Sequence, residues 1–238
     1  MMKGTPPGDV AVTPPPLPRL PLTDGASRFT VGRVWCVGRN YAAHAREMGA
    51  GPVPEPPFFF LKPTSALLPG GGEVPWPPET EDLQHEVELV IALGRGGLRV
   101  PEESAEGLLF GFGVGIDLTR RDAQAEAKRT GRPWTLAKGF DFSAPCSALV
   151  PAERSLPLRS GRLRLHVNGA LRQEGDIADQ VWPVPALIAR LSSLVELRPG
   201  DLIFTGTPAG VGSLVPGDLI EASFDDRVAI SVRITGPR

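Results

Sequence analysis

The sequence is poor in cysteine and in long apolar runs, and both shortages exclude classes of protein. Only two of its 238 residues are cysteines, Cys36 and Cys146. Without cysteine pairs at metal-ligand spacing a zinc cage is excluded, and such sparse cysteine use is typical of a reducing compartment. No run of about 18 apolar residues is present, so no membrane span is expected. Residues 1–22 lack the uninterrupted apolar stretch of a signal peptide, and we therefore expect a cytoplasmic protein.

The chain also lacks an excess of charge of either sign. Its 25 basic and 27 acidic residues leave a net charge of −2, so no basic field is available to attract nucleic acid. What is abundant is proline and glycine, 27 and 28 residues respectively, which favours many turns and short strands over long helices. The length suits one large domain, alone or with an arm.

An arm is predicted at the N-terminus, where prolines cluster. Proline fixes φ and removes a hydrogen-bond donor, so this stretch is expected to be extended and to form neither a helix nor a central strand. We predict an arm over residues 1–28 and a single domain over residues 29–238. The prolines concerned are Pro6, Pro7, Pro14, Pro15, Pro16, Pro18 and Pro21.

Residues 83–93 (LQHEVELVIAL) are predicted to form one strand with two different faces. Successive side chains of a strand point to opposite sides, so the odd positions form an apolar face. Glu86 and Glu88 then share the other face. Either this face is solvated, or the two carboxylates hold a hard cation such as Mg²⁺, which prefers oxygen ligands. His85 falls on the apolar face and is expected to have a structural role.

Two short helices carry polar residues at helical spacing. Over residues 41–48, with Asn40 as N-cap, His44 and Glu47 are three apart and share a face. A carboxylate beside a histidine fixes the tautomer and raises the basicity, which suits a general base; an exposed surface pair is the alternative.

The second helix is predicted to start at Thr119, with Asp122 completing a capping box, and to stop at Gly131. Arg121, Gln124 and Lys128 lie on one side of it, either in solvent or against a substrate. Two further lysines stand out in the sequence. Lys62 ends a strand and either reaches an anionic ligand or is a surface lysine at the sheet edge, the interpretation we favour. Lys138 has apolar neighbours that favour a buried charge near an anion.

Together these stretches resemble the fumarylacetoacetate hydrolase superfamily, and within it the acylpyruvase and oxaloacetate decarboxylase-like branch. The matching blocks follow one another in the family's order, which is far more specific than any single motif. They are residues 37–44 (VGRNYAAH) with Glu47, 60–63 (FLKP), 85–89 (HEVEL), 117–122 (DLTRRD) with Gln124, 134–138 (WTLAK), 167–175 and 200–212.

The resemblance implies an α+β fold with a mixed β-roll or β-sandwich core and short flanking helices. It also implies a homodimer, a bound Mg²⁺ or Mn²⁺, and a small 2-oxo acid as substrate. From the charge balance and the lack of long apolar runs we expect no nucleic-acid or membrane partner. The metal ligands that the resemblance implies are Glu86, Glu88 and Asp117. The catalytic residues are His44, Glu47 and Lys138, and the substrate-binding residues are Arg39, Arg121, Gln124 and Thr207.

The implied reaction is cleavage of a carbon–carbon bond through a metal-stabilised enolate, by acylpyruvate hydrolysis, oxaloacetate decarboxylation or both. The alternative is an isomerase or decarboxylase of 2-hydroxy-unsaturated dioates such as 5-carboxymethyl-2-hydroxymuconate or 2-hydroxyhepta-2,4-diene-1,7-dioate. A non-catalytic 2-oxo acid binder would not need the His44–Glu47 pair. Longer members of the family have a tyrosine near the position of Lys128, which argues against fumarylacetoacetate as the substrate.

Overall fold

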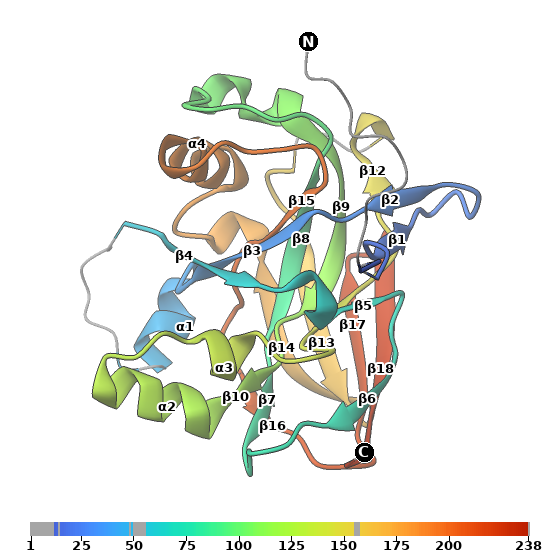
Figure 1. The fold of residues 1–238 in the computed structure, drawn as a ribbon, viewed down its shortest axis with the longest axis vertical. Coiled ribbons are helices and arrows are strands. Elements are labelled where there is room, and N and C mark those ends of the chain that lie inside the picture. Colours follow the sequence, from blue (N-terminus) through green and yellow to red (C-terminus); the bar gives the residue numbers. More distant parts are fainter. Residues whose placement is uncertain (1–11, 14, 48, 50–55, 155–157, 238) are drawn as a thin grey trace.

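The protein folds into a mixed, strand-rich structure with short helices at its periphery, as expected for the α+β class (Figure 1). The computed structural model describes residues 12–13, 15–47, 49, 56–154 and 158–237. Residues 1–11 and 14 of the predicted arm, and residues 48 and 50–55 after α1(Ala42–Glu47), lie outside these ranges. No helix among the described residues is long and apolar enough to cross a membrane.

The largest sheet has eight strands and supports the site. Strand β8 is buried on both faces, because its odd residues enter one apolar cluster while Val90 and Ala92 enter another. Gly111, Gly113 and Gly115 in β9 allow close backbone approach, as a Cβ there would fall within 3 Å of neighbouring atoms. The order is β4(Phe58–Lys62), β3(Arg33–Gly38), β15(Asp201–Phe204), β8(Val87–Leu93), β9(Leu109–Ile116), β11(Ala144–Cys146) and β5(Leu67–Pro69), with β12(Val150–Pro151) beside β9.

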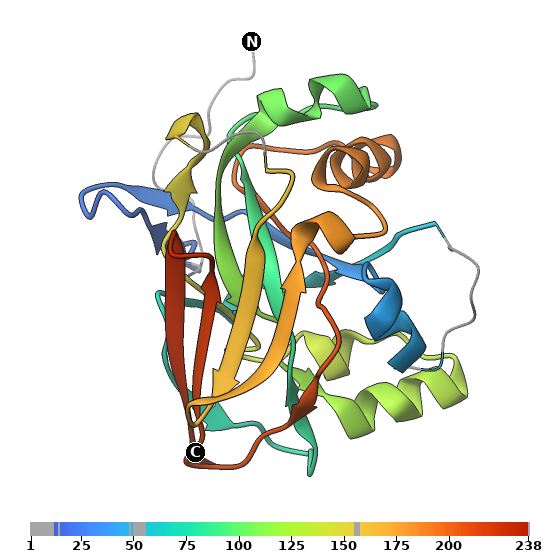
Figure 2. The ribbon, with the colours of Figure 1, turned by 180° about the vertical axis from the view of Figure 1, so that it is seen from behind.

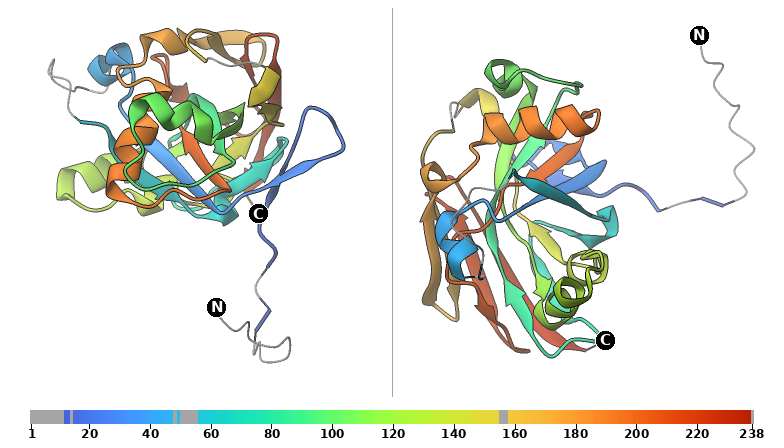
Figure 3. Two further views of the ribbon diagram at one scale, coloured as in Figure 1. Left: turned by 90° about the horizontal axis from the view of Figure 1, so that it is seen from above. Right: turned by 90° about the vertical axis from the view of Figure 1, so that its left-hand side faces the viewer.

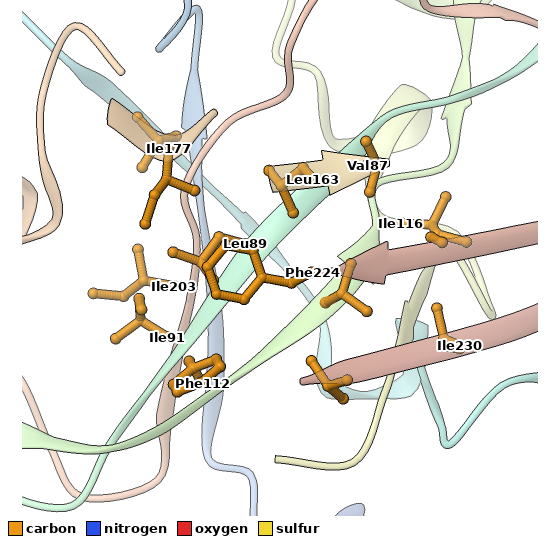
Figure 4. Close-up of a cluster of buried hydrophobic side chains, with 14 of the residues drawn as sticks. Val87, Leu89, Ile91, Phe112, Ile116, Leu163, Ile177, Ile203, Phe224 and Ile230 are labelled. Carbon is orange, nitrogen blue, oxygen red and sulfur yellow. The ribbon is translucent and has the colours of Figure 1, made fainter. Parts of the chain in front are cut away.

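A second sheet of five strands packs on the first. Figure 4 shows Phe224 from this sheet beside Leu89 and Phe112 of the first, with Ile230 further along the same apolar core. Asn168 and Gly169 form the tight turn between β13 and β14, both with positive φ, and an Asn-Gly pair is the sequence most typical of such a hairpin turn. The order is β14(Ala170–Asp176), β13(Arg162–Val167), β17(Leu219–Phe224), β18(Val228–Pro237) and β6(Gly72–Trp76).

The helices lie in two groups on the rim of the sheets (Figures 1 and 2). Helix α4 packs with η2 at one end, and α1, α2 and α3 gather at the other, near a small sheet. Helix α2 ends at Gly131 in the left-handed conformation, as predicted. The bounds are α1(Ala42–Glu47), α2(Arg121–Thr130), α3(Thr135–Lys138), α4(Val184–Leu194), η1(Thr64–Ala66), η2(Glu102–Leu108), η3(Ala152–Arg154) and η4(Ile177–Asp179). The small sheet has the order β10(Thr119–Arg120), β7(Leu83–His85) and β16(Gly212–Ser213).

The prediction that the folded part begins near Phe29 is wrong. Strand β1(Arg19–Pro21) pairs with β2(Arg28–Thr30), and Leu20 and Leu22 are buried in the second apolar cluster. This hairpin is visible at one side of the molecule in Figure 3. Leu20 and Leu22, on either side of Pro21, supply the apolar contacts. A strand at a sheet edge tolerates proline because the N–H groups on its outer side need no partner strand.

Two predicted helix caps are also wrong, since tertiary contacts recruit the side chains. The Asn40 amide donates to the carbonyls of Trp182 and Thr205, at 2.9 and 2.8 Å, and accepts from the Trp182 N–H. The N-cap of α2 is Arg120, without a side-chain hydrogen bond. The Thr119 hydroxyl instead donates to the Asp117 carbonyl.

Candidate active site

Three carboxylates meet where the large sheet joins the small one. The predicted strand 83–93 is broken at Glu86, between β7 and β8, and Asp117 directly follows β9. The pairing of Val87 with Ile116 brings Asp117 across from Glu86, whose carbonyl accepts from the Asp117 N–H at 2.8 Å. Glu86, Glu88 and Asp117 are at most 5% exposed, so the solvated-face interpretation is wrong.

Cationic side chains surround two of the carboxylates. The Lys138 ammonium lies 2.7 Å from both Glu86 Oε2 and Asp117 Oδ2. Lys62 Nζ is 2.8 Å from Asp117 Oδ1, and Arg121 contacts Glu86 Oε1 at 2.6 Å. Burial alone would raise the pKa of Glu86, but the charges of Lys138 and Arg121 outweigh it and hold that pKa below its ordinary value. Asp117 and Glu86 likewise raise the pKa of Lys138 against the effect of burial.

Glu88 has no such compensation. Its carboxylate accepts from the Gly206 N–H at 2.8 Å, and no cationic side chain of the described ranges lies within ion-pair distance. Burial, and then the charges of Asp117 and Glu86, raise the pKa of Glu88 well above its ordinary value. An uncompensated carboxylate at this depth is costly unless a cation joins it.

The donor set fits a divalent cation. One oxygen from each of the three carboxylates lies within 4.8 Å of the others. That span is close to the roughly 4.2 Å between opposite oxygens of one Mg²⁺ ion. Asp117 Oδ1 is buried and, although Lys62 is close, the angle between them gives it no hydrogen bond. It therefore keeps a lone pair for a ligand.

His44 and Glu47 come together on α1 as predicted. His44 Nδ1 lies 3.4 Å from Glu47 Oε2, which leaves Nε2 available on the histidine. Glu47 is held in turn by the Gly210 N–H, at 3.2 Å from Oε2. Burial lowers the pKa of His44, and the nearby carboxylates of Glu86 and Glu47 only partly oppose this effect. The ring is thus neutral near pH 7, the state a general base requires.

Arg121 is engaged by the protein at each nitrogen. Besides Glu86, it donates to Gln84 at 2.7 Å and to Gln124 at 2.6 Å. Because the Gln124 carbonyl accepts from Arg121, its amide NH₂ is left to donate elsewhere. These bonds favour Arg121 as a group that orients Glu86 and Gln124, while its substrate contact stays a prediction.

A single pocket collects nearly all the predicted site residues. Nine of the ten line it, the tenth being Glu47 behind His44, and it holds about 390 Å³ of space including its open mouth. Phe60, Lys128 and Trp134 line it as well. The pocket therefore suits a small, charged ligand. The predicted residues that line it are Arg39, His44, Glu86, Glu88, Asp117, Arg121, Gln124, Lys138 and Thr207.

The interpretation of Lys62 as a surface lysine is wrong. Its side chain is fully buried and also bonds Ser143 Oγ at 3.0 Å and the carbonyls of Leu118 and Lys138. The sequence suggested that Lys62 lies at an exposed strand end. The segments that cover this end of β4 are α3 and the turn at residues 140–143, and both are distant from Lys62 in sequence. The structure is nearer to the alternative of a lysine that contacts an anion, and here that anion is the Asp117 carboxylate of the protein itself.

Gln173 was not predicted at all. It is fully buried and accepts from the Val87 N–H at 3.1 Å, with His85 Nδ1 at 2.9 Å from the same oxygen. Its amide donates to Thr207 Oγ1 at 2.8 Å and to the Pro208 carbonyl. Gln173 thus ties the strand break beside Glu86 to the Thr207 loop, and the structural role expected for His85 is confirmed.

Comparison with known proteins places the chain among enzymes. A family profile described as Fumarylacetoacetate (FAA) hydrolase C-terminal matches residues 33–235. The mitochondrial oxaloacetate tautomerase FAHD1 of Rattus norvegicus is 44% identical over 216 residues, which are 88% of this chain and 97% of that protein. The mitochondrial oxaloacetate decarboxylase of Dictyostelium discoideum is 43% identical over 190 residues, 79% of this chain and 87% of that protein.

Solved structures agree. A fumarylpyruvate hydrolase from Pseudomonas aeruginosa, in complex with Mn²⁺ and pyruvate, superposes with a TM-score of 0.93 at 43% identity and covers 95% of this chain and 99% of its own. A 5-carboxymethyl-2-hydroxymuconate delta-isomerase from Mycobacterium smegmatis is less similar, with a TM-score of 0.79 and 32% identity over 89% of this chain and 81% of its own. The Mn²⁺ complex and the buried acidic triad together support divalent-metal binding.

Proposed function

Because this chain belongs to the fumarylacetoacetate hydrolase family, we propose that it is a divalent-metal-dependent enzyme that cleaves a carbon–carbon bond in a small 2-oxo acid. Acylpyruvate hydrolysis and oxaloacetate decarboxylation are the two reactions proposed. The observation that carries the proposal is the buried carboxylate triad with the Lys138 ammonium beside it, inside a pocket that also contains a histidine–glutamate pair.

Glu86, Glu88 and Asp117 would hold the cation, which supplies positive charge and Lewis acidity when bound. Lys138 is positioned to stabilise negative charge that develops on the substrate during bond cleavage, because its ammonium is fixed by two carboxylates in a buried site. Gln124, whose amide NH₂ is left to donate, and Thr207, which also lines the pocket, would orient the acid.

His44 would act in hydrolysis only. As a neutral imidazole backed by Glu47, it can take a proton from water as the water attacks the distal carbonyl of an acylpyruvate. Decarboxylation of oxaloacetate needs no attacking water, so His44 is dispensable for that step. The two reactions therefore make different demands on one pocket.

The isomerase alternative is less supported, since the relatives of higher identity are named for oxaloacetate and fumarylpyruvate. Mn²⁺ and Mg²⁺ remain alternatives for the metal, as both accept oxygen ligands.

We further propose, from the family resemblance, that the protein is a homodimer, which light scattering can check. The cytoplasmic location, proposed from cysteine use, can be checked by cell fractionation.

The test measures pyruvate release from acetylpyruvate and from oxaloacetate, with Mn²⁺, with Mg²⁺ and with a chelator. We expect metal-dependent turnover that Glu86→Gln abolishes. His44→Ala should reduce acetylpyruvate hydrolysis at least tenfold more than oxaloacetate decarboxylation. Turnover unaffected by the chelator, or absent for both substrates while a ring-cleavage dioate reacts, would overturn the proposal.

A further inference from the structure

The pocket carries more positive charge than a simple 2-oxo acid needs. Four cationic side chains and three carboxylates line it. The inner cations, Lys138 and Arg121, are paired with Glu86 and Asp117. A divalent cation on the triad would add two further positive charges. A ligand with one carboxylate would therefore leave a surplus of positive charge at the outer part of the pocket.

Lys128 supplies charge to that outer part. It follows Arg121 by seven residues on α2, so it shares the face of the helix that lines the pocket and lies about 10 Å further along the axis. Its ammonium is 5.4 Å from the centre of the Trp134 ring, and Trp134 packs edge-on against Phe60. The Lys138 ammonium lies over Phe60 at 5.5 Å. The two lysines thus contact successive rings of one aromatic wall.

Within the described ranges no carboxylate lies at ion-pair distance from Lys128. Partial burial, and then the charges of Arg121 and Arg39, lower the pKa of Lys128, and the Glu86 carboxylate only partly opposes them. A lysine on a pocket wall without a carboxylate partner can form its charge-assisted hydrogen bond with an anionic group of the ligand.

We propose that Lys128 binds the distal carboxylate of the substrate and so selects 2-oxo dicarboxylates over 2-oxo acids whose far end is uncharged. This inference rests on the proposed function, since the triad and Lys138 must hold the 2-oxo acid end. It makes Lys128 the residue that decides the substrate class, while the bond-cleaving groups stay the same for both classes.

The test compares two stable acids of equal chain length, 2-oxoglutarate and 2-oxopentanoate, which differ by a terminal carboxylate against a methyl group. Binding to the full, Mn²⁺-loaded protein is measured by calorimetry. We expect wild type to prefer 2-oxoglutarate by about tenfold, a difference of about 1.4 kcal/mol, and Lys128→Gln to abolish that preference. The matched control is Arg129→Gln, the next residue on α2, which is ion-paired with Glu126 and lies outside the pocket lining.

The outcomes separate the two proposals. A preference that is lost in Lys128→Gln and kept in Arg129→Gln supports the role of Lys128, and its decline in wild type with added salt supports it further. Equal binding of both acids to wild type, or a preference that survives Lys128→Gln, overturns this inference and leaves the metal-dependent 2-oxo acid enzyme intact. Absence of Mn²⁺-dependent binding of either acid overturns both.

Discussion

Replacing Glu88 by glutamine should make the protein more stable without metal and less stable with it. Glu88 is 1% exposed, has the Gly206 N–H as its hydrogen-bond donor, and has no cationic partner in the described part of the chain. An ionised carboxylate so placed costs several kcal/mol. The isosteric amide removes that cost and keeps an oxygen for the Gly206 N–H.

Without metal, the stability that Glu88→Gln gains over wild type should increase as the pH rises. Burial and the neighbouring carboxylates raise the pKa of Glu88 above its ordinary 4.5, so the folded protein holds this proton more tightly than the unfolded chain. Wild type therefore loses stability as pH rises above about 4.5 toward the raised pKa, by up to about 1.4 kcal/mol per pH unit. The variant lacks this slope.

The expected magnitude at pH 8 in chelator is a gain on the order of 2 kcal/mol for Glu88→Gln. The gain is smaller than the full burial cost because the Gly206 N–H loses a charged acceptor. For a domain of this size it corresponds to a melting temperature about 5 °C higher. At a Mn²⁺ concentration of 100 times Kd, wild type gains about 2.7 kcal/mol. The variant should bind Mn²⁺ at least about 100-fold more weakly and so gain no more than about 0.4 kcal/mol at the same concentration, which makes wild type the more stable protein with metal.

The assay is thermal unfolding at pH 5 and pH 8, each with chelator and with Mn²⁺. Glu221→Gln is the control, since it makes the same chemical change at an exposed strand position of β17 and should leave every midpoint within about 1 °C. A variant less stable than wild type in chelator at pH 8 would refute the claim that Glu88 is an uncompensated buried charge. Unchanged Mn²⁺ stabilisation of the variant would refute its role as a ligand.

Three further perturbations test the supports of the site. Lys62→Met should lower the free energy of unfolding in chelator by about 3–5 kcal/mol, since it removes one of the two buried ammonium groups that are ion-paired with Asp117; a loss under 1 kcal/mol in denaturant titrations contradicts this. Gln173→Leu should weaken Mn²⁺ binding about tenfold in calorimetry, because such supporting partners orient metal ligands, and unchanged affinity would count against it. Because burial lowers the pKa of His44 below its ordinary 6.5, the acid limb of acetylpyruvate hydrolysis should have its midpoint under pH 6.5. A midpoint above that value in wild type removes His44 as the base.

The local sequence pattern by itself determined the faces of one strand, one turn and one helix end. The alternation in residues 83–93 identified the apolar face and placed two glutamates together, because side-chain direction in a strand follows from position alone. Asn168-Gly169 and Gly131 marked a turn and a helix end, since few other residues adopt positive φ readily. The ordered blocks of family residues indicated the fold and the members of the site.

Tertiary structure alone decided how those members are held. Lys62, Gln173 and Arg121 owe their roles to contacts with residues at least 35 positions away, so no local pattern reports them. The predicted caps failed for the same reason, because a buried polar side chain bonds the partner that folding brings nearest, and that partner need not be a neighbour in sequence. Chain direction and spacing thus fix which face a residue occupies, whereas burial and charge pairing depend on what the rest of the chain packs against it.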